Sequence, residues 1–126
     1  MDRGFALAGS LSAFIAVAAG AFGAHALRAR IAPDLLATFE TGNRYQMYHA
    51  LALFVVAILA ARFPVAPLRL AGWLFIAGTV LFSGSLYLLA ITGVRWLGAI
   101  TPFGGLCFLG GWAALGYAAL KGGLTQ

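Results

Sequence analysis

Charge is what this sequence of 126 residues has least of, since only eight residues are Lys or Arg and three are Asp or Glu. A soluble domain of average composition carries charge at about 25% of its positions, because polar groups must cover its surface. Hydrophobic residues make up 63% of the chain, and the mean hydropathy is +0.97. This balance excludes a soluble fold. It also excludes disorder, since disordered chains are poor in aromatics and 13% of these residues are aromatic.

Cysteines and basic clusters are scarce as well. The single cysteine, Cys107, lies in an apolar run and has no second thiol with which to form an intrachain disulfide. The net charge of +5 comes from basic residues that stand singly at the ends of apolar stretches. That placement is typical of the ends of membrane-spanning helices. We therefore expect the lipid bilayer, and no nucleic acid, as a partner.

Recognisable catalytic and ligand-binding motifs are also lacking. The sequence contains no phosphate-binding loop, nucleophile elbow or zinc-protease motif. His25, His49 and Cys107 do not form a recognised metal-binding pattern, although two histidines on neighbouring helices are one way to hold a haem. We expect neither a metal nor a cofactor.

Long uncharged runs dominate the sequence instead. Four of them, which we place at residues 4–25, 45–62, 70–93 and 96–120, have the length of about 17–25 residues that crosses a bilayer as an α-helix. Their continuity excludes transmembrane β-strands, which alternate polar and apolar residues. The sequence therefore predicts an all-α integral membrane protein with four transmembrane helices in one antiparallel bundle.

The segments next to the first span allow two further predictions. Ala-His-Ala at 24–26 is similar to a signal-peptide cleavage site, but the preceding apolar stretch is longer than usual, which favours a retained span. Pro33 followed by Asp34 is typical of a helix start, and apolar residues then recur at helical spacing. We expect a short amphipathic helix over 33–43 at the membrane interface. The alternative is that it continues through Gly42 into the second span.

The orientation in the membrane depends on the positive charges. An even number of spans puts both termini on one side. That side carries Arg3, Arg62, Arg69 and Lys121, and the other carries Arg28, Arg30, Arg44 and Arg95. If Glu40 neutralises Arg44, the excess of positive charge lies beside the termini, which predicts that the termini are cytoplasmic.

Glycine is abundant, with 17 residues, and small residues form faces in the first and fourth spans. Small residues let helix backbones approach closely in lipid, where helix association depends on packing rather than on the hydrophobic effect. These faces predict tight packing within the protomer or between protomers.

Polar residues gather where the second span begins. They are Glu40, Asn43, Arg44, Tyr45, Gln46, Tyr48 and His49, and the other spans offer His25, Ser83, Ser85, Tyr87 and Thr101 as partners. Glu40 and Arg44 are four residues apart, so a helix places them on one face as a possible ion pair. One interpretation is a pocket built on Glu40, His25 and His49 that titrates protons or binds a ligand. The other is a structural network that fixes the helix register.

Four blocks of sequence resemble a known family. They are GAFGAH at 20–25, FET at 39–41 with RYQMYHALA at 44–52, FSGSLY at 82–87, and GAITPFGG at 98–105. Together they resemble the YgdD-like family of bacterial membrane proteins, which is related to the eukaryotic transmembrane protein 256. The resemblance covers essentially the whole chain. It implies a small multi-pass protein of the bacterial inner membrane and implies no activity.

Three functions are compatible with these features. We favour a non-enzymatic membrane protein that packs into a homo-oligomer or onto a larger complex, because small-residue faces are present and a soluble catalytic domain is not. The alternative is an oligomeric transporter or channel for a small solute or proton, in which Glu40, Arg44, His49 and His25 line the path. The third is an enzyme that uses the same residues for acid–base work on a lipid-soluble substrate.

Overall fold

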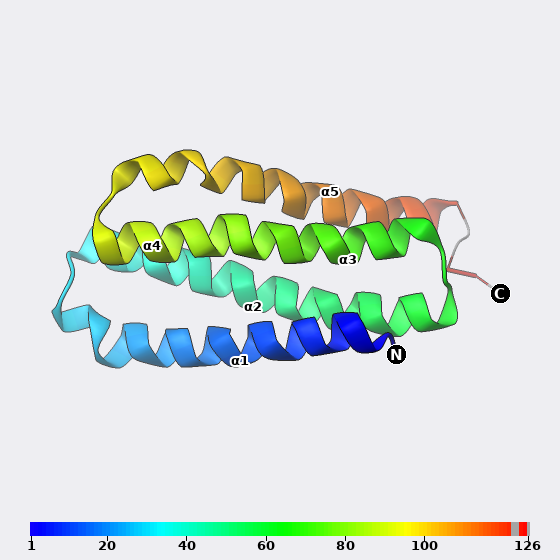
Figure 1. The fold of residues 1–126 in the computed structure, drawn as a ribbon, viewed down its shortest axis with the longest axis horizontal. Helices are drawn as coiled ribbons and strands as arrows, with labels where there is room; N and C mark the ends of the chain where they lie inside the picture. The colour runs from blue at the N-terminus through cyan, green and yellow to red at the C-terminus, as the bar shows by residue number, and fades with distance from the viewer. Residues whose placement is uncertain (122–123, 126) are drawn as a thin grey trace.

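The computed structural model describes residues 1–121 and 124–125, and every regular element within them is helical. The elements are α1 (Arg3–His25), η1 (Leu27–Ala29), α2 (Pro33–Arg62), α3 (Ala66–Gly78), η2 (Thr79–Ser83), α4 (Gly84–Thr92), η3 (Arg95–Ala99) and α5 (Thr101–Leu120). Figure 1 shows an elongated antiparallel bundle in which both termini lie at the same end. We call this end the terminal end and the opposite end the loop end.

Local sequence explains where the helices begin and end. The Asp2 carboxylate accepts a hydrogen bond of 3.1 Å from the Phe5 amide and so caps the start of α1. Pro33 occupies the first turn of α2, where no amide hydrogen is needed, and Asp34 favours the positive end of the helix dipole. Gly93 ends α4 with a φ of 73°, a left-handed conformation that glycine adopts without steric cost.

Four helical segments are long and apolar enough to cross a membrane, at residues 3–29, 33–62, 66–92 and 95–120. The third consists of α3, η2 and α4, which form one rod across Figure 1. The predicted all-helical fold with four spans is confirmed.

The helix predicted over 33–43 begins at Pro33 as expected but is not separate, because α2 runs without a break from Pro33 to Arg62; the alternative, continuation through Gly42 into the second span, is the one that the structure shows. Gly42 is buried inside this helix and is a contact point rather than a break. A Cβ at Gly42 would lie 3.1 Å from the Leu86 Cβ and 3.3 Å from the Ser83 carbonyl oxygen. Close packing against the third span therefore outweighs the low helix propensity of glycine.

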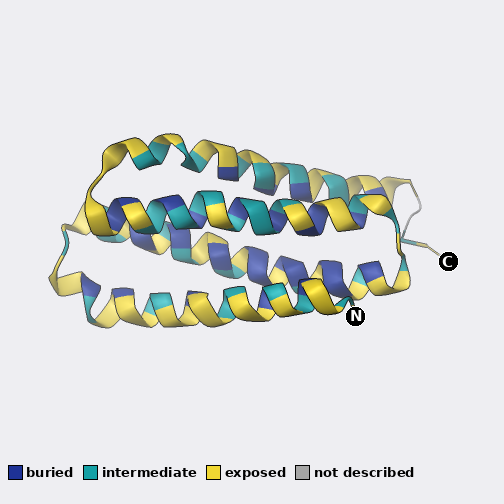
Figure 2. Cartoon of the chain, viewed as in Figure 1, coloured by how far each residue is buried: buried dark blue, intermediate teal, exposed yellow. Residues whose placement is uncertain are grey.

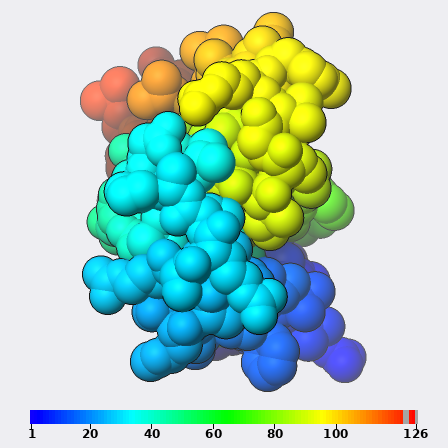
Figure 3. Space-filling view, turned by 90° about the vertical axis from the view of Figure 1, so that its left-hand side faces the viewer, coloured from blue at the N-terminus to red at the C-terminus, as the bar shows by residue number. Residues whose placement is uncertain are grey.

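The four spans differ in how far they are buried. α2 and the α3–α4 rod form the inner pair, while α1 packs mainly on α2 and α5 packs mainly on α3 and η2. Figure 2 accordingly shows α1 largely exposed and the buried residues concentrated on the inner pair. At the loop end, seen in Figure 3, the start of α2 lies beside the segment after α4, and Arg95 forms a 3.5 Å ion pair with Asp34.

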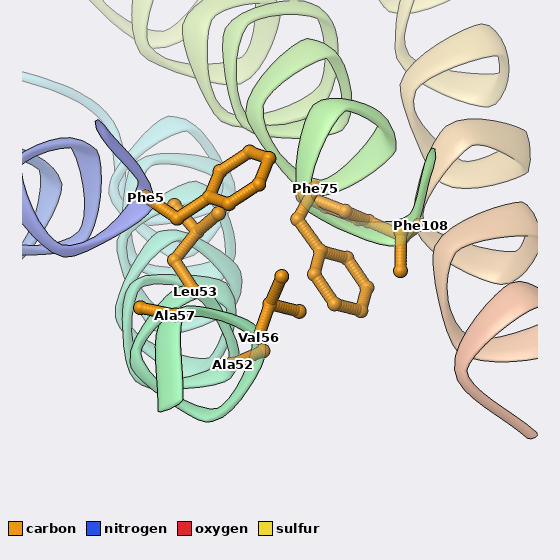
Figure 4. Packing of buried hydrophobic residues seen from close by; sticks show 8 residues of the cluster. Phe5, Ala52, Leu53, Val56, Ala57, Phe75 and Phe108 are labelled. Atoms are coloured by element: carbon orange, nitrogen blue, oxygen red, sulfur yellow. The ribbon is translucent and has the colours of Figure 1, made fainter. Parts of the chain in front are cut away.

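The main core joins all four spans near the terminal half of the bundle. It contains Phe5, Ala52, Leu53, Val56, Ala57, Ala71, Phe75 and Phe108. Figure 4 shows the Phe5 ring extending from α1 toward α3, where it packs against Gly72, and the Phe75 ring beside Val56 of α2. Smaller clusters lie around Phe39 at the loop end and around Leu68 at the terminal end.

A π-helical turn, η2, interrupts the α3–α4 rod. The extra residue of such a turn shifts the buried face, so the step from buried Gly78 to buried Ser83 is five residues instead of three or four. The Ser83 hydroxyl then donates a 2.6 Å hydrogen bond to the Gly42 carbonyl of α2. On the other side, Gly104 of α5 packs directly on the backbone of Phe82. The turn thus lies where two neighbouring helices meet the rod.

Candidate functional site

The polar residues singled out from the sequence separate into three groups in the structure. Asn43, Gln46 and Tyr87 form a network between α1, α2 and α4; Ser83, Ser85, Thr101 and His49 make individual helix-to-helix bonds; and Glu40, Arg44, Tyr45, Tyr48 and His25 are exposed. The single pocket built on Glu40, His25 and His49 is therefore not formed within this chain.

A network of side-chain hydrogen bonds joins α1 to α2 and α4. The Gln46 amide nitrogen donates a hydrogen bond of 3.1 Å to the Ser12 carbonyl, and the Gln46 amide oxygen accepts one of 2.6 Å from the Tyr87 hydroxyl. The Asn43 amide nitrogen donates hydrogen bonds of 2.7 Å to the Ala16 carbonyl and 3.2 Å to the Tyr87 hydroxyl oxygen. In lipid, polar bonds of this kind hold helices together because no water competes for them. The network is a structural device that fixes the register of α1.

The hydroxyls of the third span form two further links. Ser83 binds the Gly42 carbonyl, as described, and Ser85 and Thr101 share a hydrogen bond of 2.6 Å between their hydroxyls. The second link fastens the start of α5 to α4. Among the described residues, no buried side-chain nitrogen or oxygen lacks a hydrogen-bond partner. These serines therefore have structural bonds of their own.

His49 lies buried between α2, α3 and α5 among aromatic rings. Its ring stacks on Phe108, with centroids 3.6 Å apart and planes 6° from parallel, and Phe75 flanks it. The Trp112 indole, which can only donate, lies 3.1 Å from Nε2, and Nδ1 lies 2.7 Å from the Tyr45 carbonyl. Nε2 must therefore be the acceptor and Nδ1 the donor. This arrangement selects a neutral imidazole whose two nitrogens are both bonded.

Two grooves open on the sides of the bundle. One, of about 520 Å³, lies between α2 and α5 with His49 and Trp112 at its wall. The other, of about 270 Å³, lies between α1 and the α3–η2 segment, with Ser12, Gln46 and Thr79 among its lining residues. The side chains of Gln46, Thr79 and Trp112 at these grooves already hydrogen-bond within the chain, and most of the lining is apolar, so both surfaces suit lipid chains.

Glu40 and Arg44 are exposed on α2, and the ion pair that their spacing allows is not formed. The Arg44 guanidinium instead lies 3.3 Å from the Thr41 hydroxyl. Within the described residues, the ion pairs between side chains are Arg69–Asp2 and Arg95–Asp34, one at each end of the bundle. Glu40 and Arg44 point away from the helices of their own chain because the buried face of α2 is formed by other positions, Gly42 among them.

The depth of Arg44 makes its exposure significant. The Asp2 backbone amide donates a hydrogen bond of 2.7 Å to the Ala57 carbonyl, so Ala57 lies level with the start of α1. Arg44 is thirteen positions before Ala57, about 20 Å at a rise of 1.5 Å per residue. The hydrocarbon core is about 30 Å thick. The Asn43 amide binds the carbonyl of Ala16, in the middle of the uncharged stretch of α1, so the neighbouring Arg44 lies level with the interior of a candidate membrane span.

Metal binding finds no support in the part of the chain that the structure describes. No group of three His, Cys, Asp or Glu side chains there is arranged to hold an ion. His25 is exposed at the end of α1, whereas His49 lies deep in the bundle, and Cys107 is a half-buried free thiol on α5. The two histidines therefore do not share a site for a haem.

Three important residues were not singled out from the sequence. Ser12, Phe108 and Trp112 complete the contacts of Gln46 and His49. In an apolar span, an isolated serine, phenylalanine or tryptophan gives no local signal of a polar contact. Their assignment needed the positions of α1 and α5 relative to α2.

Comparison with known proteins agrees with the membrane assignment. A family model described as protein of unknown function DUF423 matches residues 19–105. The UPF0382 membrane protein YwdK of Bacillus subtilis is 49% identical over 118 residues, which cover 93% of this chain and 96% of the relative. The UPF0382 membrane protein SERP0230 of Staphylococcus epidermidis is 46% identical over 117 residues, covering 93% and 95%. No solved structure matches the chain. The chain therefore belongs to the DUF423 family of membrane proteins of unknown function.

Proposed function

We propose that this protein is a non-enzymatic component of the bacterial inner membrane that assembles with other membrane-embedded chains. The observation that carries the proposal is the exposure of Glu40 and Arg44 within a candidate membrane span, without an ion-pair partner among the described residues. Charged side chains within a membrane normally face other protein or a water-filled cavity. A second protein surface against α2 would supply that environment.

The interior of the bundle supports assembly over catalysis. The buried polar groups that a reaction would need are already engaged: His49 binds Trp112 and Tyr45, and Gln46 binds Ser12 and Tyr87. A general acid or base must be able to reach a proton on the substrate. His49, with both ring nitrogens bonded inside the bundle, does not offer that access.

Blue-native electrophoresis of gently solubilised membranes tests the proposal. We expect a complex with at least twice the protein mass of one 13.1 kDa chain. The double variant Glu40→Gln with Arg44→Gln should shift most of the protein to the monomer, because the charges that favour a protein neighbour are gone. The matched control, Asp34→Asn with Arg28→Gln, alters exposed charges at the loop end and should leave the complex intact. A monomeric parent protein contradicts the proposal.

Transport is the second candidate, and the same exposed pair favours it. The core of the described bundle is filled by side chains from all four spans, but several copies with α2 facing a common axis would line that axis with Glu40 and Arg44. Flux of protons or small ions into liposomes containing the protein tests this function. Glu40→Gln should reduce the flux at least tenfold if Glu40 lines the path; flux equal to that of empty liposomes rules it out.

We also propose that both termini are cytoplasmic. Arg44 lies at membrane depth, so the loop end retains Arg28, Arg30 and Arg95 against four basic residues at the terminal end. This asymmetry follows the positive-inside rule. In a Cys107→Ser background, an impermeant maleimide added to cells with a permeabilised outer membrane should label Ala29→Cys but not Ala66→Cys. The reverse pattern would show the opposite orientation.

The relation to the eukaryotic transmembrane protein 256 is likewise proposed from the resemblance. It predicts the same order of spans in that protein and the same bonding of α1 to α2 through polar residues. An experimental structure of the eukaryotic protein with a different helix order would refute the relation.

A further inference from the structure

One face of α2 is exposed along its whole length. The exposed positions are Ala37, Glu40, Arg44, Tyr48, Leu51, Val55 and Ile58, which we call the α2 stripe. Steps of three and four residues separate them, so they follow the 3.5-residue spacing that keeps a seam facing one partner helix. The stripe is polar toward the loop end and apolar toward the terminal end.

The charges of the stripe distinguish it from the other exposed surfaces. On α1 no Asp, Glu, Lys or Arg follows Arg3, and α5 contains none of these residues. The exposed faces of those two helices suit lipid. On the stripe, Glu40 and Arg44 lie one turn apart with opposite charge, yet Arg44 contacts Thr41 and leaves the Glu40 carboxylate unpaired within the described residues.

We propose that the α2 stripe is the interface with a second copy of this chain. This inference rests on the proposed assembly function and names its partner. Two copies share one orientation in the membrane, so a two-fold axis along the membrane normal places their α2 helices parallel. In that arrangement each residue lies level with its own counterpart, and Glu40 of each copy reaches Arg44 of the other diagonally, about one helical turn along the seam. The apolar positions from Tyr48 to Ile58 pack against their counterparts.

Charge complementarity favours a second copy over a different protein or lipid. A two-fold interface brings the same patch of each subunit together, so the patch must be complementary to itself. One acidic and one basic residue, a helical turn apart, satisfy this requirement through two reciprocal ion pairs. Arginine also forms two parallel hydrogen bonds to a carboxylate, which fixes the register of the two helices.

Disulfide crosslinking tests the contact surface. In a Cys107→Ser background, three exposed leucines at different faces are replaced separately: Leu51→Cys on the stripe, Leu11→Cys on α1 and Leu109→Cys on α5. A disulfide requires Cα atoms about 4.4–6.8 Å apart. Mild oxidation in native membranes should crosslink Leu51→Cys at least tenfold more completely than either control, since tenfold corresponds to about 1.4 kcal/mol of preference.

Charge reversal tests the ion pairs. In the Leu51→Cys background, Glu40→Arg alone or Arg44→Glu alone places like charges across the interface, and crosslinking should fall at least tenfold because such contacts cost several kcal/mol. Co-expression of the two variants, each with a different tag, restores opposite charges at both contacts. Crosslinked heterodimers should then form at the parental level, while homodimers stay scarce. Both changed residues are exposed, so the bundle itself should remain folded.

The possible outcomes separate this inference from the proposed function. Crosslinks at Leu11→Cys or Leu109→Cys but not at Leu51→Cys overturn the α2 interface and leave assembly standing. A larger complex on blue-native gels that contains only one copy of the chain likewise overturns the α2 interface and leaves assembly standing. No crosslinks together with a monomer overturn both. If both single charge variants crosslink as completely as the Leu51→Cys parent, the pairing of Glu40 with Arg44 is overturned. It is also overturned if co-expression of the two variants does not restore crosslinking.

Discussion

Replacing Gly104 with alanine is expected to destabilise the folded bundle strongly. A Cβ at Gly104 would lie 2.7 Å from the Phe82 Cα and equally close to its Cβ. Phe82 belongs to the π-helical turn η2, whose backbone is held by packing and by the Ser83 bond to α2, so it cannot move aside without separating α5 from the rod. We expect the free energy of unfolding to fall by about 3 kcal/mol, the upper range for overpacking.

Gly105→Ala and Gly116→Ala are the matched controls, because they place the same methyl group on the same helix. A Cβ at Gly105 would meet only the Phe82 ring, at 4.0 Å, and a Cβ at Gly116 would meet nothing within 4 Å. Both changes should leave stability unchanged or raise it slightly, since alanine has the higher helix propensity. Unfolding by sodium dodecyl sulfate, followed by circular dichroism, measures all three. Equal midpoints for Gly104→Ala and Gly105→Ala would contradict the close approach.

His49→Ala should cause the second large loss of stability. It removes a ring that stacks on Phe108 at 3.6 Å, and it deprives the Trp112 indole of its acceptor. Truncation of a large buried side chain costs about 2–5 kcal/mol through lost contacts and the cavity that remains. We expect a loss of about 3 kcal/mol, together with a change in Trp112 fluorescence as the ring environment opens.

The other histidine provides the control for this prediction. His25 is exposed at the end of α1, so His25→Ala should change the free energy of unfolding by no more than about 0.5 kcal/mol. A Trp112→Phe variant separates the two contributions, because it removes the indole donor and leaves the His49 stacking in place. If His49→Ala is as stable as His25→Ala, His49 is not a packing residue of this bundle.

The helical spans could be predicted from the sequence because long uncharged runs have one stable form in a bilayer. The length of α2 was harder to predict. Gly42 usually weakens a helix, and only the contact with Leu86 and the Ser83 carbonyl shows why it is tolerated here. The π-helical turn gave no signal in the sequence, since its residues Thr79–Ser83 are unremarkable for an apolar span.

The site was only partly accessible from the sequence, for a reason specific to membranes. Helical spacing correctly places Glu40, Arg44 and Tyr48 on one face and Gly42 and Gln46 on another. It does not tell which face points inward, because lipid and protein interior are both apolar and the hydrophobic pattern no longer distinguishes them. The packing of α1 on Asn43 and Gln46 decides the rotation of α2, and that packing involves residues 27 and 34 positions away.

The hydrogen bonds between α1 and α2 also bear on how the chain enters the membrane during synthesis. α2 is the least apolar of the four spans, and an arginine near the centre of a helix opposes insertion by about 2.5–3.5 kcal/mol. α1 leaves the ribosome first and is more apolar than α2, so we expect it to enter the bilayer before α2. The carbonyls of Ser12 and Ala16 are then available to accept hydrogen bonds from the side-chain amides of Gln46 and Asn43. Biosynthesis is thereby favoured through an α1–α2 hairpin rather than through single helices.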